Sequence, residues 1–170
     1  MIQPTFNFAD LFELLADAGP DRLALVAPPA RLTYGQLDER ATRLANHLAG
    51  LGVAPGDHVG IHSMNRAEWI ESMFACFKLR AVPINVNYRY VETELRYLYD
   101  NADCVVTIAE REFVDRIEAV RGELPLLRSV LVIGDAYEAA IAAASPERRF
   151  GRRSPDDIYI VYTGGTTGMP

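Results

Sequence analysis

The 170-residue sequence lacks the features that mark several large classes of protein. Its two cysteines, Cys76 and Cys104, are too few for a disulfide scaffold and too far apart for a zinc-binding pair. No apolar run approaches the roughly 18 residues of a membrane-spanning helix. Residues 1–20 lack the basic and apolar segments of a signal peptide. We therefore expect a cytoplasmic protein with two reduced, buried thiols, and contact with a membrane surface stays an open alternative.

Lysine is almost absent as well. Lys78 is the only lysine, and all other cationic side chains are arginines. The 17 basic residues stand against 23 acidic ones, so the formal net charge is −6. Binding of nucleic acid requires a basic surface that displaces counterions from phosphates. We therefore expect no nucleic-acid partner.

What is present is the composition of a globular domain, with 49% hydrophobic and 24% charged residues. Short β-rich runs alternate with longer segments of helical apolar spacing, which predicts an α/β fold with a mainly parallel sheet flanked by helices. Expected strands are 23–27, 31–33, 58–62, 82–86, 104–108, 129–133 and 158–162, and expected helices are 7–17, 33–52, 65–80, 91–100, 110–121 and 135–144.

Three parts are expected along the chain. Residues 1–144 form an α/β subdomain, 145–157 a polar linker rich in arginine, and 158–170 a strand with a glycine-rich loop. Pro83 marks its strand as an edge strand or a bulge. Capping side chains are expected at Asn7, at Thr33 with Gln36, at Asn65 with Glu68, and at Asp135 with Glu138.

Ligands of parallel sheets gather at the carboxyl ends of the strands. The loops that qualify by position follow Ser63, Asn85, Ala109, Gly134 and Tyr162. The last of them is unusual, because it carries three glycines and three threonines. Glycines let backbone N–H groups approach an anion closely, and threonine hydroxyls can donate to phosphate oxygens. The loop lacks the order of a Walker A motif, and a merely flexible polar tail is the alternative.

Three segments carry a resemblance to a known family. Residues 162–170 resemble the phosphate-binding signature of the adenylate-forming superfamily, which ends in Thr-Gly-x-Pro-Lys. Residues 32–37, Leu-Thr-Tyr-Gly-Gln-Leu, resemble an early motif of the same enzymes, and residues 77–85 resemble a second one. The Val-Pro-Ile-Asn at 82–85 is closer to acyl- and aryl-CoA ligases than to peptide-synthetase domains. The chain as a whole resembles the N-terminal part of the large domain of a long-chain acyl-CoA synthetase.

The resemblance implies an enzyme that activates a carboxylic acid, such as a long-chain fatty acid, with Mg-ATP to an acyl-AMP and transfers the acyl group to coenzyme A. It implies that the terminal loop holds the ATP phosphates through Thr163, Gly164, Gly165, Thr166, Thr167 and Gly168. It places no catalytic residue and no metal ligand within these 170 residues. Fatty, aromatic and steroid-derived acids remain open as substrates, and so does a homodimer.

Two departures from the family pattern concern turns. Arg80 stands where a glycine is common, and Gly164-Gly165 stands where serine-glycine is usual. In the family a lysine would follow Pro170, and the adenine site, the ribose-binding aspartate and the small C-terminal domain would lie further on. We therefore expect a truncated chain that does not form an adenylate on its own.

Other interpretations compete with this one. The rival function is a non-catalytic module for phosphate binding or oligomerisation. His58 and His62 share a strand face but have no further ligands nearby, so ordinary histidines are favoured over a metal site. The arginines of 148–153 favour a solvated hinge over contact with coenzyme A or anionic lipid. Aromatic residues at helical spacing, expected in the core, are Trp69, Phe74, Phe77, Tyr97 and Tyr99.

Overall fold

The computed structural model describes residues 7–162 of the chain. Its elements are α1 (Phe8–Ala18), β1 (Leu23–Ala27), β2 (Ala30–Thr33), α2 (Tyr34–Gly50), β3 (His58–His62), α3 (Ala67–Leu79), β4 (Val82–Asn85), α4 (Glu92–Asn101), β5 (Cys104–Glu110), α5 (Arg111–Arg121), β6 (Ser129–Ile133) and α6 (Asp135–Ala143). The predicted helices and the first six predicted strands are confirmed, with small shifts at their ends.

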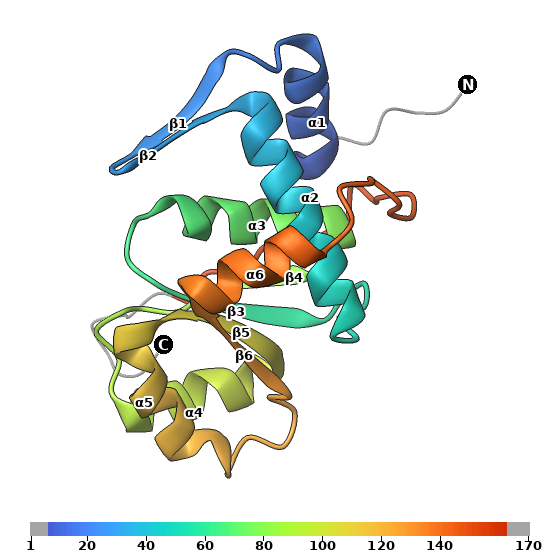
Figure 1. Ribbon diagram of the computed structural model, residues 1–170. Coiled ribbons are helices and arrows are strands. Elements are labelled where there is room, and N and C mark those ends of the chain that lie inside the picture. Colours follow the sequence, from blue (N-terminus) through green and yellow to red (C-terminus); the bar gives the residue numbers. More distant parts are fainter. Residues whose placement is uncertain (1–6, 163–170) are drawn as a thin grey trace.

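A four-stranded parallel sheet in the order β4-β3-β5-β6 forms the centre of the molecule (Figure 1). Helices α2, α3 and α6 cover one face, where their apolar residues pack on Val59, Val106 and Ile108. Helices α4 and α5 cover the other face and pack on β4 and β5. The predicted α/β class with a helix-flanked parallel sheet is confirmed. Within this sheet β4 is an edge strand, as Pro83 predicts.

Helix α1 and the β1–β2 hairpin lie outside the main sheet, next to α2 and α3 (Figure 1). The hairpin is antiparallel, as expected, and pairs Ala27 with Ala30 at its turn. Asn7 caps α1 by accepting a hydrogen bond from the Ala9 amide at 2.8 Å. Thr33 and Gln36 form the predicted capping box at the start of α2.

Two predicted caps are wrong. Helix α3 begins after Arg66, not Asn65, and no side chain caps it, because the Glu68 carboxylate is bound by the Arg66 guanidinium at 2.8 Å. Helix α6 begins after Gly134, whose φ of 127° suits glycine alone. Asp135 therefore lies in the first turn of α6. Its negative charge interacts favourably with the positive end of the helix dipole, but its side chain does not cap the helix.

The predicted strand 158–162 is also wrong in extent. Only Ile160 pairs with the sheet, through a single parallel bridge to Ile84 of β4. Ile158 and Val161 are exposed, and the Tyr159 ring turns to the edge of Phe77. One residue pair does not make a ladder, so this segment extends the sheet past β4 without forming a strand.

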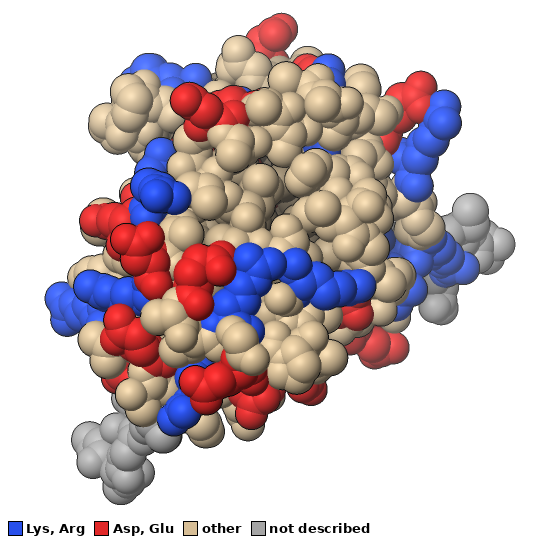
Figure 2. Space-filling model, turned by 60° about the horizontal axis from the view of Figure 1, so that its bottom comes forward, with Lys and Arg blue, Asp and Glu red and all other residues tan. Residues whose placement is uncertain are grey.

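Basic and acidic side chains are interspersed over the face shown in Figure 2. Within residues 7–162, no helix is long and apolar enough to cross a bilayer. Cys76 and Cys104 are free and buried, and burial raises the pKa of the Cys104 thiol to about 12.

Candidate functional site

A cavity of about 550 Å³ opens where β3 and β4 end. Residues from three chain segments line it: Ser63, Met64, Asn65 and Trp69 after β3, Asn85, Val86, Asn87 and Tyr88 after β4, and Tyr162. The predicted loops after Ser63 and Asn85 therefore meet at one site, and Tyr162, which precedes the last predicted loop, also reaches it. The loops after Ala109 and Gly134 do not line it. The cavity lies at the carboxyl edge of a parallel sheet, where such sheets bind ligands.

Hydrogen bonds fix the residues around the cavity. The Trp69 indole N–H donates to Asn85 Oδ1 at 3.3 Å, which joins α3 to the end of β4. The Met64 amide donates to Glu110 Oε1 at 2.6 Å, so the end of β5 supports the loop after β3. These contacts hold the lining in place, as a site for a small molecule requires.

Trp69 corrects one sequence expectation. It was grouped with the core aromatics, but it is half-buried and lines the cavity. The core interpretation is confirmed for Phe77 and Tyr99, which are buried. Phe74 and Tyr97 are half-buried. Helical spacing alone does not distinguish Trp69 from the others. It indicates which face of a helix is apolar, but not that Trp69, near the start of α3, lies at the edge of the sheet where the cavity opens.

Tyr162 connects this site to the glycine-rich loop. Its hydroxyl donates to Asn101 Oδ1 at 2.8 Å, and its side chain lines the cavity. The predicted phosphate-binding residues Thr163, Gly164, Gly165, Thr166, Thr167 and Gly168 lie outside the described residues. Their predicted role is therefore untested, while the residue that precedes them is placed at the cavity.

The motif at residues 77–85 forms the turn from α3 into β4. Arg80 ends the helix in the left-handed conformation, with φ of 63°, and its amide donates to Phe77 O. This conformation explains why a glycine suits the position. The Arg80 guanidinium pairs with Asp157 at 2.8 Å, so the arginine adds a contact that glycine could not make.

Lys78 lies in the same motif and is fully buried. Its ammonium contacts Glu13 of α1 at 2.5 Å and Asp38 of α2 at 2.7 Å. Sequence analysis missed this cluster. One signal in the sequence could have indicated it. The single lysine stands between Phe77 and Leu79 in an apolar part of the helix, where a buried charge needs carboxylate partners.

The arginines of 148–153 lie in different environments. Arg148 binds Asp38 at 2.7 Å, and Arg153 binds Glu13 at 2.8 Å and Asp10 at 2.5 Å. Arg149 and Arg152 are exposed. The hinge interpretation is therefore wrong for the two arginines that are held by carboxylates of α1 and α2.

The two histidines of β3 have separate environments on the same face. His58 bonds to the Ala102 carbonyl through Nδ1. His62 is fully buried and stacks on Phe113 at 4.4 Å, and neither of its ring nitrogens has a hydrogen-bond partner among residues 7–162. Burial, aided by the charge of Arg116, lowers the pKa of His62 to about 4. Across residues 7–162, no three His, Cys, Asp or Glu side chains are grouped to hold a metal ion.

Residues 12–170 match the family of AMP-binding enzymes. A 3-oxocholest-4-en-26-oate–CoA ligase of Rhodococcus rhodochrous is 51% identical, over 96% of this chain and 32% of that enzyme. A medium/long-chain-fatty-acid–CoA/3-oxocholest-4-en-26-oate–CoA ligase of Mycobacterium tuberculosis H37Rv is 47% identical over the same shares. The chain thus spans about a third of the length of these curated relatives.

Solved structures give the same picture. An anthranilate–CoA ligase in complex with anthranoyl-AMP superimposes with a TM-score of 0.93 and 30% identity, over 98% of this chain and 34% of that one. The N-terminal domain of FACL13 from Mycobacterium tuberculosis superimposes with a TM-score of 0.90 and 27% identity, over 96% and 42% of the two chains.

Proposed function

The chain belongs to the family of AMP-binding enzymes, and from this premise we propose that it forms the amino-terminal third of an acid–CoA ligase. In the first step a carboxylate oxygen attacks the α-phosphorus of Mg-ATP, the bond to the β-phosphate breaks, and pyrophosphate leaves. In the second step the thiol of coenzyme A attacks the acyl carbon and loses its proton, and AMP leaves. ATP with its Mg²⁺, the acid and coenzyme A are substrates of this reaction.

The observation that carries the proposal is the position of Tyr162. It lines the cavity at the carboxyl edge of the sheet, and the glycine- and threonine-rich loop begins at the next residue. A loop that starts there can bring its amides and hydroxyls to the cavity opening. This is the position at which a parallel sheet offers its ligand site.

Within that site, residues 163–168 would bind the β- and γ-phosphates. Charge accumulates on these phosphates as they leave, so fixed N–H and O–H donors stabilise the transition state more than the ground state. Thr166 and Thr167 supply hydroxyl donors, and the glycines let the amides approach. The described residues assign no general base, and the first step needs none, because the carboxylate is already ionised.

We propose a hydrophobic carboxylic acid as the acyl substrate. The two curated relatives carry fatty acids and a steroid-derived acid in their names, which puts these two classes first. An aromatic acid ranks behind them, because the anthranilate ligase is the more distant relative, at 30% identity.

A screen of acids tests the proposal. A protein of the relatives' length that contains this chain is incubated with Mg-ATP, coenzyme A and one acid at a time. The acids are palmitate, a steroid side-chain carboxylate and anthranilate. We expect AMP, pyrophosphate and acyl-CoA in equal amounts with at least one of the first two. Formation of none of these products from any acid would contradict the ligase assignment.

The same assay separates the ligase from a phosphate-binding or oligomerisation module. The match over residues 12–170 favours the ligase. For the 170-residue chain on its own we expect no acyl-AMP, because the adenine and ribose sites that the family uses are outside it. Acid-dependent exchange of pyrophosphate into ATP by the isolated chain would overturn this expectation.

A further inference from the structure

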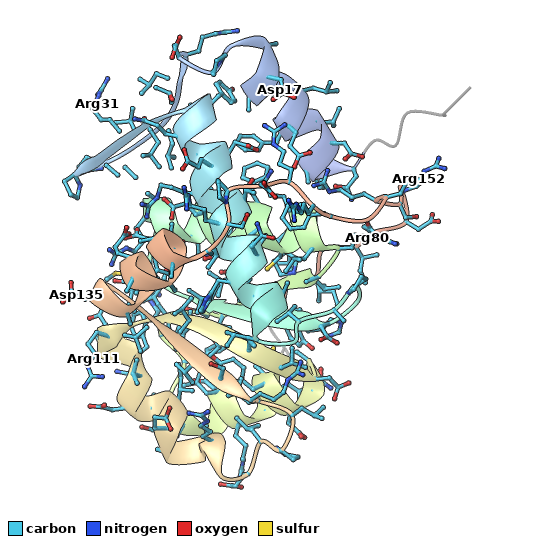
Figure 3. The ribbon with its side chains drawn as sticks, turned by 45° about the vertical axis from the view of Figure 1, so that its right-hand side comes forward. Asp17, Arg31, Arg80, Arg111, Asp135 and Arg152 are labelled. Carbon is cyan, nitrogen blue, oxygen red and sulfur yellow. The ribbon has the colours of Figure 1, made fainter. Side chains whose placement is uncertain are left out.

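Residues 145–157, here called the strap, connect α6 to the segment that reaches the cavity. The strap contains no helix or strand, yet contacts with the body of the protein run along its length. Asn46 of α2 donates to the carbonyls of Ser145 and Glu147, at 2.7 and 3.0 Å. In Figure 3 the strap passes beside α2 and α1 toward the labelled Arg152 and Arg80.

Buried charges hold the middle of the strap. Lys78 sits between two carboxylates, Glu13 and Asp38, and each of these also accepts from a strap arginine. Arg153 contacts Glu13 at 2.8 Å, and Arg148 contacts Asp38 at 2.7 Å. Helices α1, α2 and α3 and the strap thus meet in one ion-pair network. Burial favours protonation of Glu13, but hydrogen bonds from Arg153 and Lys78 outweigh it and lower its pKa.

The far end of the strap is fixed by Asp157. Its carboxylate accepts from Arg80 Nε at 2.9 Å and from Asn7 Nδ2 at 2.9 Å. Ile160 then bridges to Ile84 of β4, and Tyr162 reaches the cavity. Only a few residues separate the contacts of Asp157 from Tyr162, so the anchored strap limits where Tyr162 can lie.

We propose that Lys78, Arg148 and Arg153 are positioning residues, which hold the strap through Glu13 and Asp38 and so set the place of Tyr162 and of the ATP-binding loop that follows it. Placement of the loop rests on the proposed function, whereas placement of Tyr162 does not.

A buried ion pair is weak support for stability as such, because the cost of removing two charges from water can cancel their attraction. Breaking one partner of a buried pair, in contrast, is strongly unfavourable, so a displacement of the strap that separates Arg153 from Glu13 is costly. A short displacement of groups that contact a reacting phosphate is enough to slow catalysis strongly. The network therefore suits a role in precise placement.

Amide hydrogen exchange on the 170-residue chain tests the placement of Tyr162. In Arg153→Gln we expect exchange of amides 156–162 to accelerate by about tenfold or more, because the charged hydrogen bonds to Asp10 and Glu13 are lost, while β3 amides keep their rates. Arg149→Gln is the matched control, because Arg149 lies in the same strap but is 79% exposed, and its one ion pair within residues 7–162 is with its neighbour Glu147. Equal rates in all three proteins would overturn the proposal. Acceleration that spreads equally to β3 would overturn it as well.

Three further variants keep the proposal testable if Arg153→Gln does not fold. Arg148→Gln replaces a strap arginine that is 33% exposed, so it tests the same contact if Arg153→Gln does not fold. Lys78→Met is compared with Glu71→Gln, which disrupts a second buried network of Arg40 and Tyr137 that does not touch Arg148 or Arg153. We expect both to lower stability and only Lys78→Met to accelerate exchange at 156–162 selectively. The same exchange pattern in both would contradict a specific role for Lys78.

The ligase assay tests the effect on the loop. In a protein of the relatives' length, Arg153→Gln should lower kcat/KM for Mg-ATP by about tenfold, through kcat, KM or both, while KM for the acid stays constant. An unchanged kcat/KM for Mg-ATP, or a KM for the acid that rises as well, would contradict placement of the loop. If the unmodified protein activates no acid, the proposed function fails, and the exchange experiment still decides the position of Tyr162.

Discussion

At the scale of single residues, His62 is unusual because it is polar and fully buried, and because it has no hydrogen-bond partner in the part of the chain that the structure describes. Its ring stacks nearly parallel to Phe113, at an interplanar angle of 8°. A neutral imidazole can occupy such a place, but an imidazolium there would lose its hydration without gaining a partner. Arg116 nearby adds a like charge. The residue therefore makes the fold sensitive to acid.

The sign and size of this effect follow from the pKa. In the unfolded chain His62 binds a proton below about 6.5, whereas in the folded chain it stays neutral down to about 4. Between these values the unfolded state binds more protons, so stability falls as pH falls. The full loss through His62 is about 3 kcal/mol. The variant His62→Leu should not lose this part of its free energy of unfolding as the pH falls, and urea unfolding at several pH values measures the difference. Parallel pH curves for the two proteins would contradict it.

At the scale of elements, β3 and β5 pack closely against α4 because Gly60 has no side chain. A Cβ at this position would lie 2.8 Å from Tyr99 Cε1 and 2.9 Å from Thr107 Oγ1. These two side chains bond to each other at 3.0 Å, and Thr107 also donates to the Gly60 carbonyl. Gly60 of β3, Thr107 of β5 and Tyr99 of α4 thus pack as one unit that joins the two strands to the helix.

We expect Gly60→Ala to lower the free energy of unfolding by about 1–3 kcal/mol, because the added methyl group forces these neighbours apart. Gly50→Ala is the matched control. A Cβ at Gly50 would meet no atom of another part of the described chain within 4 Å, and the residue lies in the last turn of α2, so this variant should keep stability or raise it slightly. Urea unfolding of both variants measures the difference. Equal stabilities would show that Gly60 is not required for the close packing.

The sequence predicts which helices and strands form better than it predicts where they end and what they contact. Apolar spacing is local, and it correctly predicted strands and helices from 7 to 144. The position of the strap contacts is not local, since Glu13 and Arg153 meet only in the folded chain. The strand expected at 158–162 failed for a related reason. Its composition is β-rich, but strand pairing also requires a neighbouring strand in register. Among residues 158–162, Ile160 alone forms a β-bridge.

At the scale of the whole molecule, the sequence predicted the α/β fold and the edge of the sheet at which the site lies. It also predicted the two loops after Ser63 and Asn85 that line the cavity, but not Trp69, whose helical spacing indicates a core residue. The motifs around Thr33 and Arg80 now have a structural explanation as the start of α2 and the end of α3. The phosphate role of residues 163–168 is still a prediction, and it is the claim on which the proposed chemistry depends.

Exchange of labelled pyrophosphate into ATP tests that claim most directly, because it isolates the adenylation step. The assay uses a protein of the relatives' length, with and without its acid and without coenzyme A. Thr166→Ala with Thr167→Ala is compared with Thr93→Ala, which removes a threonine hydroxyl from the exposed surface of α4. We predict acid-dependent exchange that falls by about tenfold or more in the double variant and stays constant in the control. Exchange that is undiminished in the double variant would contradict the phosphate-binding role of the loop.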